Sequence, residues 1–221
     1  MDIKRKILTL RELIPENVAM VAVSKFHPAS MILEAYEAGQ RLFGESRVQE
    51  FLQKHQELPK DIHWHFIGHL QTNKVKQIIG KTSLIESVDT PRLLELINKE
   101  SEKAGLKTKV LLQVHVAAEE AKFGFYPNEL REYLFKGSYE SLKNVEICGL
   151  MGMATNTEDE KRIKEDFAIL HALFEEIKGK SLPALENFGT LSMGMSGDWA
   201  LAIEEGSNLV RIGSAIFGER V

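Results

Sequence analysis

The chain alternates short apolar runs with longer stretches in which apolar residues recur every three or four positions. Short apolar runs are typical of strands buried on both faces, and the three-to-four spacing is typical of helices with one buried face. Strands that alternate with helices predict a parallel sheet joined by helical crossovers. We expect strands at residues 18–24, 42–43, 64–67, 84–87, 110–116, 147–151, 187–192 and 209–212. Eight such units predict a closed (β/α)8 barrel, the TIM-barrel architecture.

The helices expected between these strands are marked by their apolar spacing and by the residues at their ends. Apolar side chains repeat at helical spacing through residues 157–178, where Thr157 and Glu160 form a capping-box pattern. Another helix is expected to have Thr90 as its N-cap and Pro91 as its first residue.

An apolar stripe of helical spacing also precedes the first strand, at Ile3, Ile7, Leu10 and Ile14. No stretch of comparable length follows the last strand. We therefore expect this extra N-terminal helix to cover the barrel in place of a helix after the eighth strand. The sequence shows no internal repeat and no Pro/Gly/Ser-rich linker, so we expect one domain over residues 1–221.

The composition of the chain excludes some classes of binding partner and indicates the cellular compartment. With 221 residues and 43% hydrophobic content, the chain can bury one substantial core. A formal net charge of -4 gives no general attraction to nucleic acid or to an anionic membrane. Cys148 is the only cysteine, which excludes an internal disulfide and a cysteine-based zinc site. Because we also find no signal peptide and no apolar stretch of membrane-spanning length, we expect a cytoplasmic protein. We also expect it to be a monomer.

Two segments at opposite ends of the chain carry the strongest chemical signal. Residues 21–25 are an apolar run that stops at Lys25, whose amine can form a Schiff base with an aldehyde. Residues 210–218 are an apolar run that leads into Gly213 and Ser214, where backbone amides can hold a phosphate. Taken singly, these are an ordinary surface lysine and a tight turn. Together they indicate pyridoxal 5'-phosphate, which carries both an aldehyde and a phosphate.

The sequence also resembles the YggS/PROSC family of pyridoxal phosphate homeostasis proteins. The resemblance lies in residues 22–25, 43–45, 64–71, 191–196 and 210–214, which occur in family order along the chain. It implies a single barrel that holds pyridoxal phosphate as an aldimine on Lys25 and that stores, buffers or delivers the cofactor. Its partners would then be pyridoxal phosphate itself and the apo-enzymes that need it.

The family resembles in turn the N-terminal barrel of alanine racemase. There the arginine of a similar Arg-x-Gly segment donates to the pyridine nitrogen, and we assign that role to Arg211. A guanidinium keeps its proton, so the ring nitrogen would stay an unprotonated acceptor and the cofactor would be a weak electron sink. No catalytic residue is therefore assigned.

Further cofactor contacts are expected around the phosphate. Gly213 and Ser214 follow the eighth strand, and Ser192 ends the seventh, where its hydroxyl can add a donor. We rank Ser192 above Ser196, which we expect to cap a helix that begins at Gly197.

Histidines, methionines and the cysteine allow other interpretations. His63 and His65 form an H-x-H pair typical of some metal sites, but His115 is the only obvious further ligand, so we expect no metal. We assign His65 to the cofactor pocket or the core beside it. Among the methionines, Met151 and Met193 are taken as pocket residues. Cys148 has no neighbouring base and is read as a small buried hydrophobe.

The chain departs from the family pattern at two places. Ser46 and Arg47 stand where the family usually has Asn-Tyr, and His115 stands where it usually has Asn. The contacts made by those asparagines are therefore in question.

Two rival functions remain open at this point. One is a racemase or decarboxylase that uses the same cofactor, although alanine racemase needs a second domain to supply the opposing base. The other is a cofactor-free Schiff-base aldolase that acts on a sugar phosphate.

Overall fold

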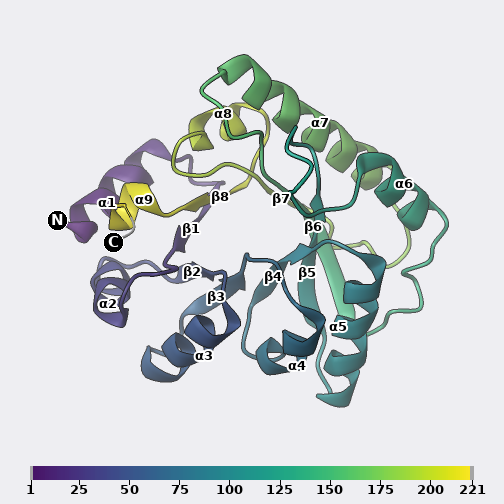
Figure 1. The fold of residues 1–221 in the computed structure, drawn as a ribbon, viewed down its shortest axis with the longest axis horizontal. Helices are drawn as coiled ribbons and strands as arrows, with labels where there is room; N and C mark the ends of the chain where they lie inside the picture. Colours follow the sequence, from purple (N-terminus) through teal and green to yellow (C-terminus); the bar gives the residue numbers. More distant parts are fainter. Residues whose placement is uncertain (1, 220–221) are drawn as a thin grey trace.

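The computed structural model describes residues 2–219, within which eight parallel strands close into a barrel in sequence order. The first strand pairs with both the second and the eighth, which closes the ring. The predicted (β/α)8 barrel is therefore confirmed (Figure 1). The strands are β1 (Ala19–Val23), β2 (Leu42–Glu45), β3 (His63–Phe66), β4 (Leu84–Val88), β5 (Thr108–Val114), β6 (Val145–Gly152), β7 (Thr190–Ser192) and β8 (Leu209–Ile212).

Helices lie outside the strands and connect them (Figure 1). They are α1 (Ile3–Leu13), α2 (Ala29–Glu37), α3 (Val48–Glu57), α4 (Val75–Ile78), which follows the 3-10 turn Thr72–Lys74, α5 (Pro91–Lys103), α6 (Pro127–Phe135), α7 (Glu160–Gly179), α8 (Trp199–Glu204) and α9 (Ser214–Phe217). Each apolar stripe faces the barrel, as the helical spacing predicts.

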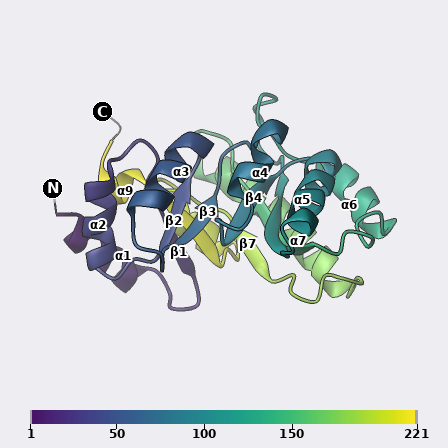
Figure 2. The same cartoon turned by 90° about the horizontal axis from the view of Figure 1, so that it is seen from below.

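The N-terminal helix α1 takes the place that a long last helix would occupy. It buries Ile3, Ile7 and Leu10 and contacts both α2 and the four-residue α9. Lys6 Nζ donates to the carbonyl oxygen of Ile216 at 3.0 Å, which joins the two ends of the chain. In Figure 2, α1, α2 and α9 gather at one end of the molecule. The expected role of this helix is confirmed.

One helix cap was predicted correctly and another was not. Thr90 Oγ1 accepts from a backbone amide in the first turn of α5 at 3.3 Å, as expected. The capping box at Thr157 and Glu160 is wrong, because α7 begins at Glu160 and its N-cap is Asp159. The Asp159 carboxylate accepts from two amides of the first turn, at 3.0 and 3.4 Å. Aspartate is as good a cap as threonine and stands immediately before the helix.

Seven strands differ from the predicted bounds by one to three residues at an end, and only β8 matches them at both ends. β2 continues through Gly44 to Glu45, whose fully buried carboxyl group is hydrogen-bonded inside the protein. β7 begins only at Thr190 rather than at Asn187. The apolar pattern did not predict the last residue of β2, because Glu45 is charged and its hydrogen-bond partner Ser24 lies elsewhere in the sequence.

The interior of the barrel holds an apolar cluster and, nearer the C-terminal ends of the strands, a polar one. The apolar cluster contains Leu84, Leu111, Cys148 and Met151. The polar cluster joins side chains of the neighbouring strands β3 and β4 to side chains of the neighbouring strands β7 and β8 across the interior of the barrel. This polar layer is the floor of the candidate site.

Candidate functional site

A cavity of about 300 Å³ opens at the C-terminal ends of the barrel strands. This is the end at which (β/α)8 barrels carry their functional sites. The lining residues come from the ends of β1, β3, β6 and β8 and from the loop after β7: Val23, Lys25, His27, Ile67, Met153, Met195, Ser196, Gly197, Arg211, Gly213, Ser214 and Gly218.

Lys25 and Gly213 come together because β1 and β8 are neighbours in the ring. Ala22 is in register with Ile212, so the residues that follow the two strands lie side by side. A Cβ on Gly213 would lie only 3.3 Å from the Cβ and the carbonyl oxygen of Val23. The absence of a side chain therefore lets the two strand ends approach closely. Lys25, half-buried, and Gly213 line the same cavity although they are far apart in the sequence.

Ser196 occupies the backbone donors that follow β8. Its Oγ accepts from the amide of Gly213 at 3.0 Å and from the amide of Ala215 at 3.3 Å. The helix-capping role expected for Ser196 is wrong, because the N-cap of α8 is Asp198. The fully buried Ser192, which was ranked higher as a phosphate ligand, does not line the cavity. The sequence positions of Ser192 and Ser196 gave no sign of this difference. In the structure, the loop after β7 places Ser196 next to the amide of Gly213.

The floor of the site is a hydrogen-bonded network centred on Glu86, which is fully buried. His65 Nδ1 lies 2.6 Å from Glu86 Oε1 and donates to it, since an ionised carboxylate can only accept. Ser192 Oγ donates to Glu86 Oε2 at 2.6 Å and accepts from Arg211 Nη1. The Arg211 guanidinium lies 3.7 Å from Glu86 Oε2 and also donates to the carbonyl oxygen of Gly152 at 2.9 Å.

Electrostatics favour the ionised form of Glu86. Burial by itself would raise the pKa of Glu86, but the hydrogen bond and charge of His65 and the charge of Arg211 outweigh it, so the pKa lies below its ordinary value. Burial lowers the pKa of Arg211, and the charges of Glu86 and Asp198 oppose that shift. Arg211 stays a cationic donor at the cavity wall because a guanidinium does not lose its proton in proteins.

Of the side chains predicted to touch a cofactor, half line the cavity and half do not. Lys25, Arg211, Gly213 and Ser214 are among the lining residues. The other four lie outside the lining: His65, Met151, Ser192 and Met193.

The residues outside the cavity lie in the network or in the core. His65 belongs to the Glu86 network, one layer below. Met151 packs in the apolar cluster of the barrel, and Met193 is fully buried in the main core. The methionines that reach the cavity are Met153, two positions beyond Met151, and Met195, in the loop after β7. Side chains within the strands are buried by the barrel itself, so only residues just past the strand ends reach the opening.

The two departures from the family pattern have structural partners outside the cavity. The His115 Nε2 atom lies 3.0 Å from the carbonyl oxygen of Glu119, and the ring contacts Tyr126. The Arg47 guanidinium lies over the ring of Phe26 at 4.5 Å. Neither His115 nor Arg47 lines the cavity.

The cysteine and the histidines considered for other chemistries lie in different surroundings. Burial, reinforced by the charge of Glu146, raises the pKa of the Cys148 thiol to about 11, far from the thiolate that a nucleophile requires. His63 is exposed whereas His65 is buried. Within residues 2–219 no three His, Cys, Asp or Glu side chains are grouped as a metal ion would need. The helices described here also include none long and apolar enough to cross a membrane.

Comparison with known proteins identifies the family. Residues 2–221 match the family described as the N-terminal domain of alanine racemase. A pyridoxal phosphate homeostasis protein of Aquifex aeolicus is 44% identical over 207 residues, covering 93% of this chain and 89% of that protein. The chain belongs to the pyridoxal phosphate homeostasis proteins of the alanine racemase N-terminal domain family.

Further similar proteins are a second curated relative and two solved structures. The human pyridoxal phosphate homeostasis protein is 40% identical over 212 residues, covering 91% of this chain and 76% of that protein. The structure of PipY from Synechococcus elongatus PCC7942 with pyridoxal phosphate bound is 37% identical, with a TM-score of 0.89 over 98% of this chain and 100% of that one. Alanine racemase of Clostridium difficile 630 shares only the fold, at 16% identity and a TM-score of 0.79. The match covers 99% of this chain and 56% of the racemase chain.

Sequence reasoning missed Glu86, ranked Ser196 below Ser192, and considered Met153 as a packing residue without assigning it to the site. A signal was present for Glu86, because it is a charged residue inside the apolar run of β4 and such residues are rarely buried without a partner. The resemblance to the homeostasis family covered Ser196 but did not assign it to the phosphate.

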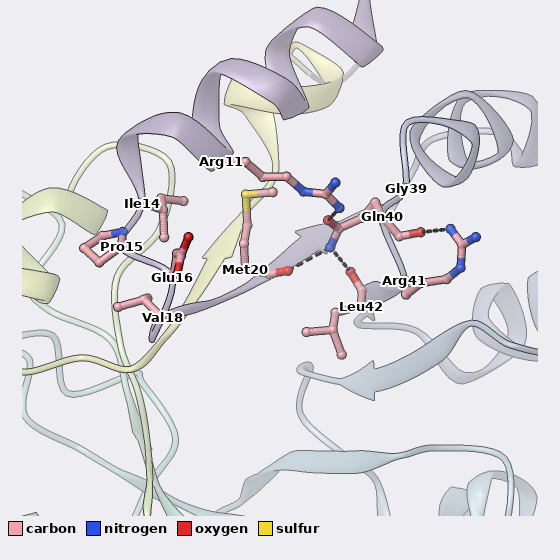
Figure 3. A pocket seen from close by; sticks show the side chains of 10 residues that line it. All are labelled: Arg11, Ile14, Pro15, Glu16, Val18, Met20, Gly39, Gln40, Arg41 and Leu42. Carbon is pink, nitrogen blue, oxygen red and sulfur yellow. Dashed lines mark hydrogen bonds between the residues drawn. The ribbon is translucent and has the colours of Figure 1, made fainter.

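A second hollow, of about 420 Å³, lies at the opposite end of the barrel beside the end of α1 (Figure 3). Gln40 crosses it, and its Nε2 donates to the carbonyl oxygens of Met20 and Leu42 at 2.7 Å each. Arg11 Nη2 donates to Gln40 Oε1 at 3.3 Å. These polar groups join α1 to the starts of β1 and β2, so we assign this hollow a structural role.

Proposed function

We propose that this protein binds pyridoxal 5'-phosphate at the C-terminal end of its barrel and serves pyridoxal phosphate homeostasis by storing, buffering or delivering the cofactor. The observation that carries the proposal is the meeting of Lys25 with Gly213 and Ser214 in one cavity. An amine for the aldehyde and backbone donors for the phosphate are the two features the cofactor requires. The homeostasis proteins named above and the pyridoxal phosphate complex of PipY support the same conclusion.

The residues of the cavity fit the cofactor at both of its ends. Lys25 would supply the amine for the aldehyde of the cofactor. At the phosphate end, the Ser196 hydroxyl already accepts from the amides of Gly213 and Ala215. These donors therefore converge on one oxygen atom, and a phosphate oxygen bound there would replace the Ser196 hydroxyl as their acceptor. When bound, the cofactor supplies an electrophilic carbon and a conjugated ring.

Arg211 decides how reactive the bound cofactor can be. The Glu86 network fixes its guanidinium at the cavity wall, where it can donate to the ring nitrogen but not protonate it. Without a protonated ring, removal of the α-proton of an amino acid is poorly stabilised. We therefore propose a protein that holds its cofactor rather than turning over substrate, with at most slow exchange of an α-proton.

The remaining assignments are part of the same proposal. We infer that the protein acts in the cytoplasm as a monomer and that apo-enzymes requiring pyridoxal phosphate are its acceptors. A single buried cysteine is consistent with a reducing compartment.

Excess apo-enzyme added to the loaded protein should gain activity faster than the cofactor dissociates into buffer. An activation rate equal to the dissociation rate would exclude direct delivery.

The proposal is tested by titrating the purified protein with pyridoxal phosphate and following its visible absorbance. Reduction with borohydride fixes the adduct, and peptide mass spectrometry then locates it. We expect the adduct on Lys25, with none at that position in Lys25→Ala. A reduced adduct found mainly on another lysine, or no adduct at all, would overturn the assignment of Lys25.

A further inference from the structure

A buried ionic cluster lies next to the turn that carries Lys25. Lys54, in α3, has a side chain only 6% exposed. Its Nζ donates to Glu45 Oε1 at 2.7 Å, to Glu50 Oε1 at 2.6 Å and to the carbonyl oxygen of Ser24 at 2.8 Å. All three ammonium donors are therefore used. Burying such charges carries a large desolvation penalty, and well-packed apolar side chains would give equal or better stability.

The cluster holds the backbone on both sides of Lys25. On one side it binds Ser24, whose carbonyl oxygen accepts from Lys54 and whose Oγ donates to Glu45 Oε1 at 2.6 Å. On the other side the amide of Phe26 donates to Glu50 Oε1 at 2.5 Å. Lys25 is thus the central residue of a turn whose neighbours are both fixed by the same charges.

The turn also has a backbone conformation that needs such support. Phe26 has a φ of 68°, in the left-handed region that a bulky residue rarely adopts. Residues in this region persist only where their surroundings over-determine them, and they are common at functional sites. Here Glu50 holds the amide of Phe26, while the Arg47 guanidinium covers its ring at 4.5 Å.

We propose that Lys54, Glu50 and Glu45 are positioning residues for Lys25: they fix the turn at residues 24–26 so that the amine of Lys25 is held where it can react with the aldehyde of the cofactor. The proposal rests on the function proposed above. The proposal distinguishes non-covalent binding of the cofactor from its reaction with Lys25. The cluster does not line the cavity, so it should affect the reaction and not the contacts that hold the phosphate and the ring.

The test compares covalent and non-covalent binding in a set of Glu50 variants. Glu50→Ala removes the acceptor for the Phe26 amide, whereas Glu50→Gln keeps an amide oxygen there. Glu57→Ala, an exposed position at the end of the same helix, is the matched control. The ligands are pyridoxal phosphate, which can react with Lys25, and pyridoxine 5'-phosphate, which has an alcohol in place of the aldehyde and cannot.

We expect Glu50→Ala to form the covalent adduct about 10-fold or more slowly than wild type, since small misplacements of a reacting group have large effects on rate. Its affinity for pyridoxine 5'-phosphate should remain within about 2-fold of wild type, because the phosphate contacts are unchanged. Glu50→Gln should recover most of the rate, and Glu57→Ala should match wild type. Lys54→Met should show the same split, but the Glu50 series decides the proposal even where Lys54→Met does not fold.

A second measurement follows the turn without any ligand. Hydrogen exchange at the Phe26 amide should be slow in wild type and Glu50→Gln and fast in Glu50→Ala.

Two results would overturn the proposal. One is a wild-type rate of adduct formation in Glu50→Ala. The other is an equal loss of affinity for both ligands, which would indicate a merely structural role. Failure of the proposed function looks different, because wild-type protein would then form no adduct on Lys25.

Discussion

Removal of Glu86 should strongly destabilise the protein, because it breaks a buried ionic network from one side. Glu86→Leu keeps a side chain of similar volume but deletes two hydrogen bonds of 2.6 Å, from His65 and Ser192, and the partner of the Arg211 charge at 3.7 Å. Hydrogen bonds to a charged group contribute about 1.5 to 3 kcal/mol each, and breaking one side of a buried ion pair costs about 3 to 5 kcal/mol. Because these two figures describe overlapping interactions, we expect a loss of about 4 kcal/mol in the free energy of unfolding.

Urea unfolding followed by circular dichroism at pH 7 measures this loss, with fluorescence as a second probe of two-state behaviour. The midpoint of thermal unfolding should fall by about 10 °C, from a scaling of about 2 to 4 °C per kcal/mol for a chain of this size. Ser192→Ala, which removes a single contact of Glu86, should lose less. In the double variant Glu86→Leu/Arg211→Leu no charge is left unpaired, so its loss should be smaller than the sum of the single losses. A loss below about 1 kcal/mol in Glu86→Leu would refute the view that the network is a stabilised ion pair.

The stability difference between wild type and Glu86→Leu should also depend on pH. The pKa of Glu86 is lower in the folded protein than its ordinary value of 4.5. Its contribution to stability is therefore complete above pH 4.5 and is lost as the pH falls through the lower folded value. Wild type should lose stability more steeply than Glu86→Leu over that acidic range. Both proteins keep Glu45, whose pKa burial raises, so the difference between them isolates Glu86. Parallel curves would contradict the assigned direction.

Further predictions concern the cofactor site and the cysteine. Lys25→Ala should lose the visible absorbance of bound cofactor and keep its unfolding free energy within about 0.5 kcal/mol, because a side chain at the cavity rim leaves no core void; a borohydride-reducible adduct at wild-type occupancy on another lysine would contradict this. Gly213→Val should weaken binding of pyridoxal phosphate more than that of pyridoxal, since its side chain would crowd both the phosphate donors and Val23; equal affinities for the two ligands in wild type would exclude a phosphate site here. With L-alanine in deuterated buffer, NMR and chiral chromatography should show at most slow α-deuteration, and sustained inversion at about 1 per second or faster would establish a racemase. Alkylation of Cys148 in folded protein should be at least about 10-fold slower than in urea at pH 7, because its pKa is about 11, and equal rates would rule out the buried thiol.

The sequence by itself determined the barrel and the location of its site. Apolar runs and helical stripes report burial that each segment achieves locally, so they predicted the strands, α1 and the order of elements. Parallel strands in a barrel bring all their C-terminal ends to one rim, so the strand ends placed Lys25 and Gly213 at the same end of the barrel. The prediction was wrong where two nearby residues could each cap the same helix: Asp159 caps α7, not Thr157.

Tertiary structure alone decided which polar groups reach the cavity and which support it. Ser192 bonds to Glu86 across 106 positions of sequence, and Ser196 reaches the amide of Gly213 across 17. Lys54 and Ser24, 30 positions apart, meet because β1, β2 and α3 converge there. No spacing rule encodes such pairs, because the partners of a buried charge are set by how the strands close into a ring. The pattern of the chain therefore specifies the barrel, whereas the tertiary structure decides which polar side chains pair with buried charges such as Arg211.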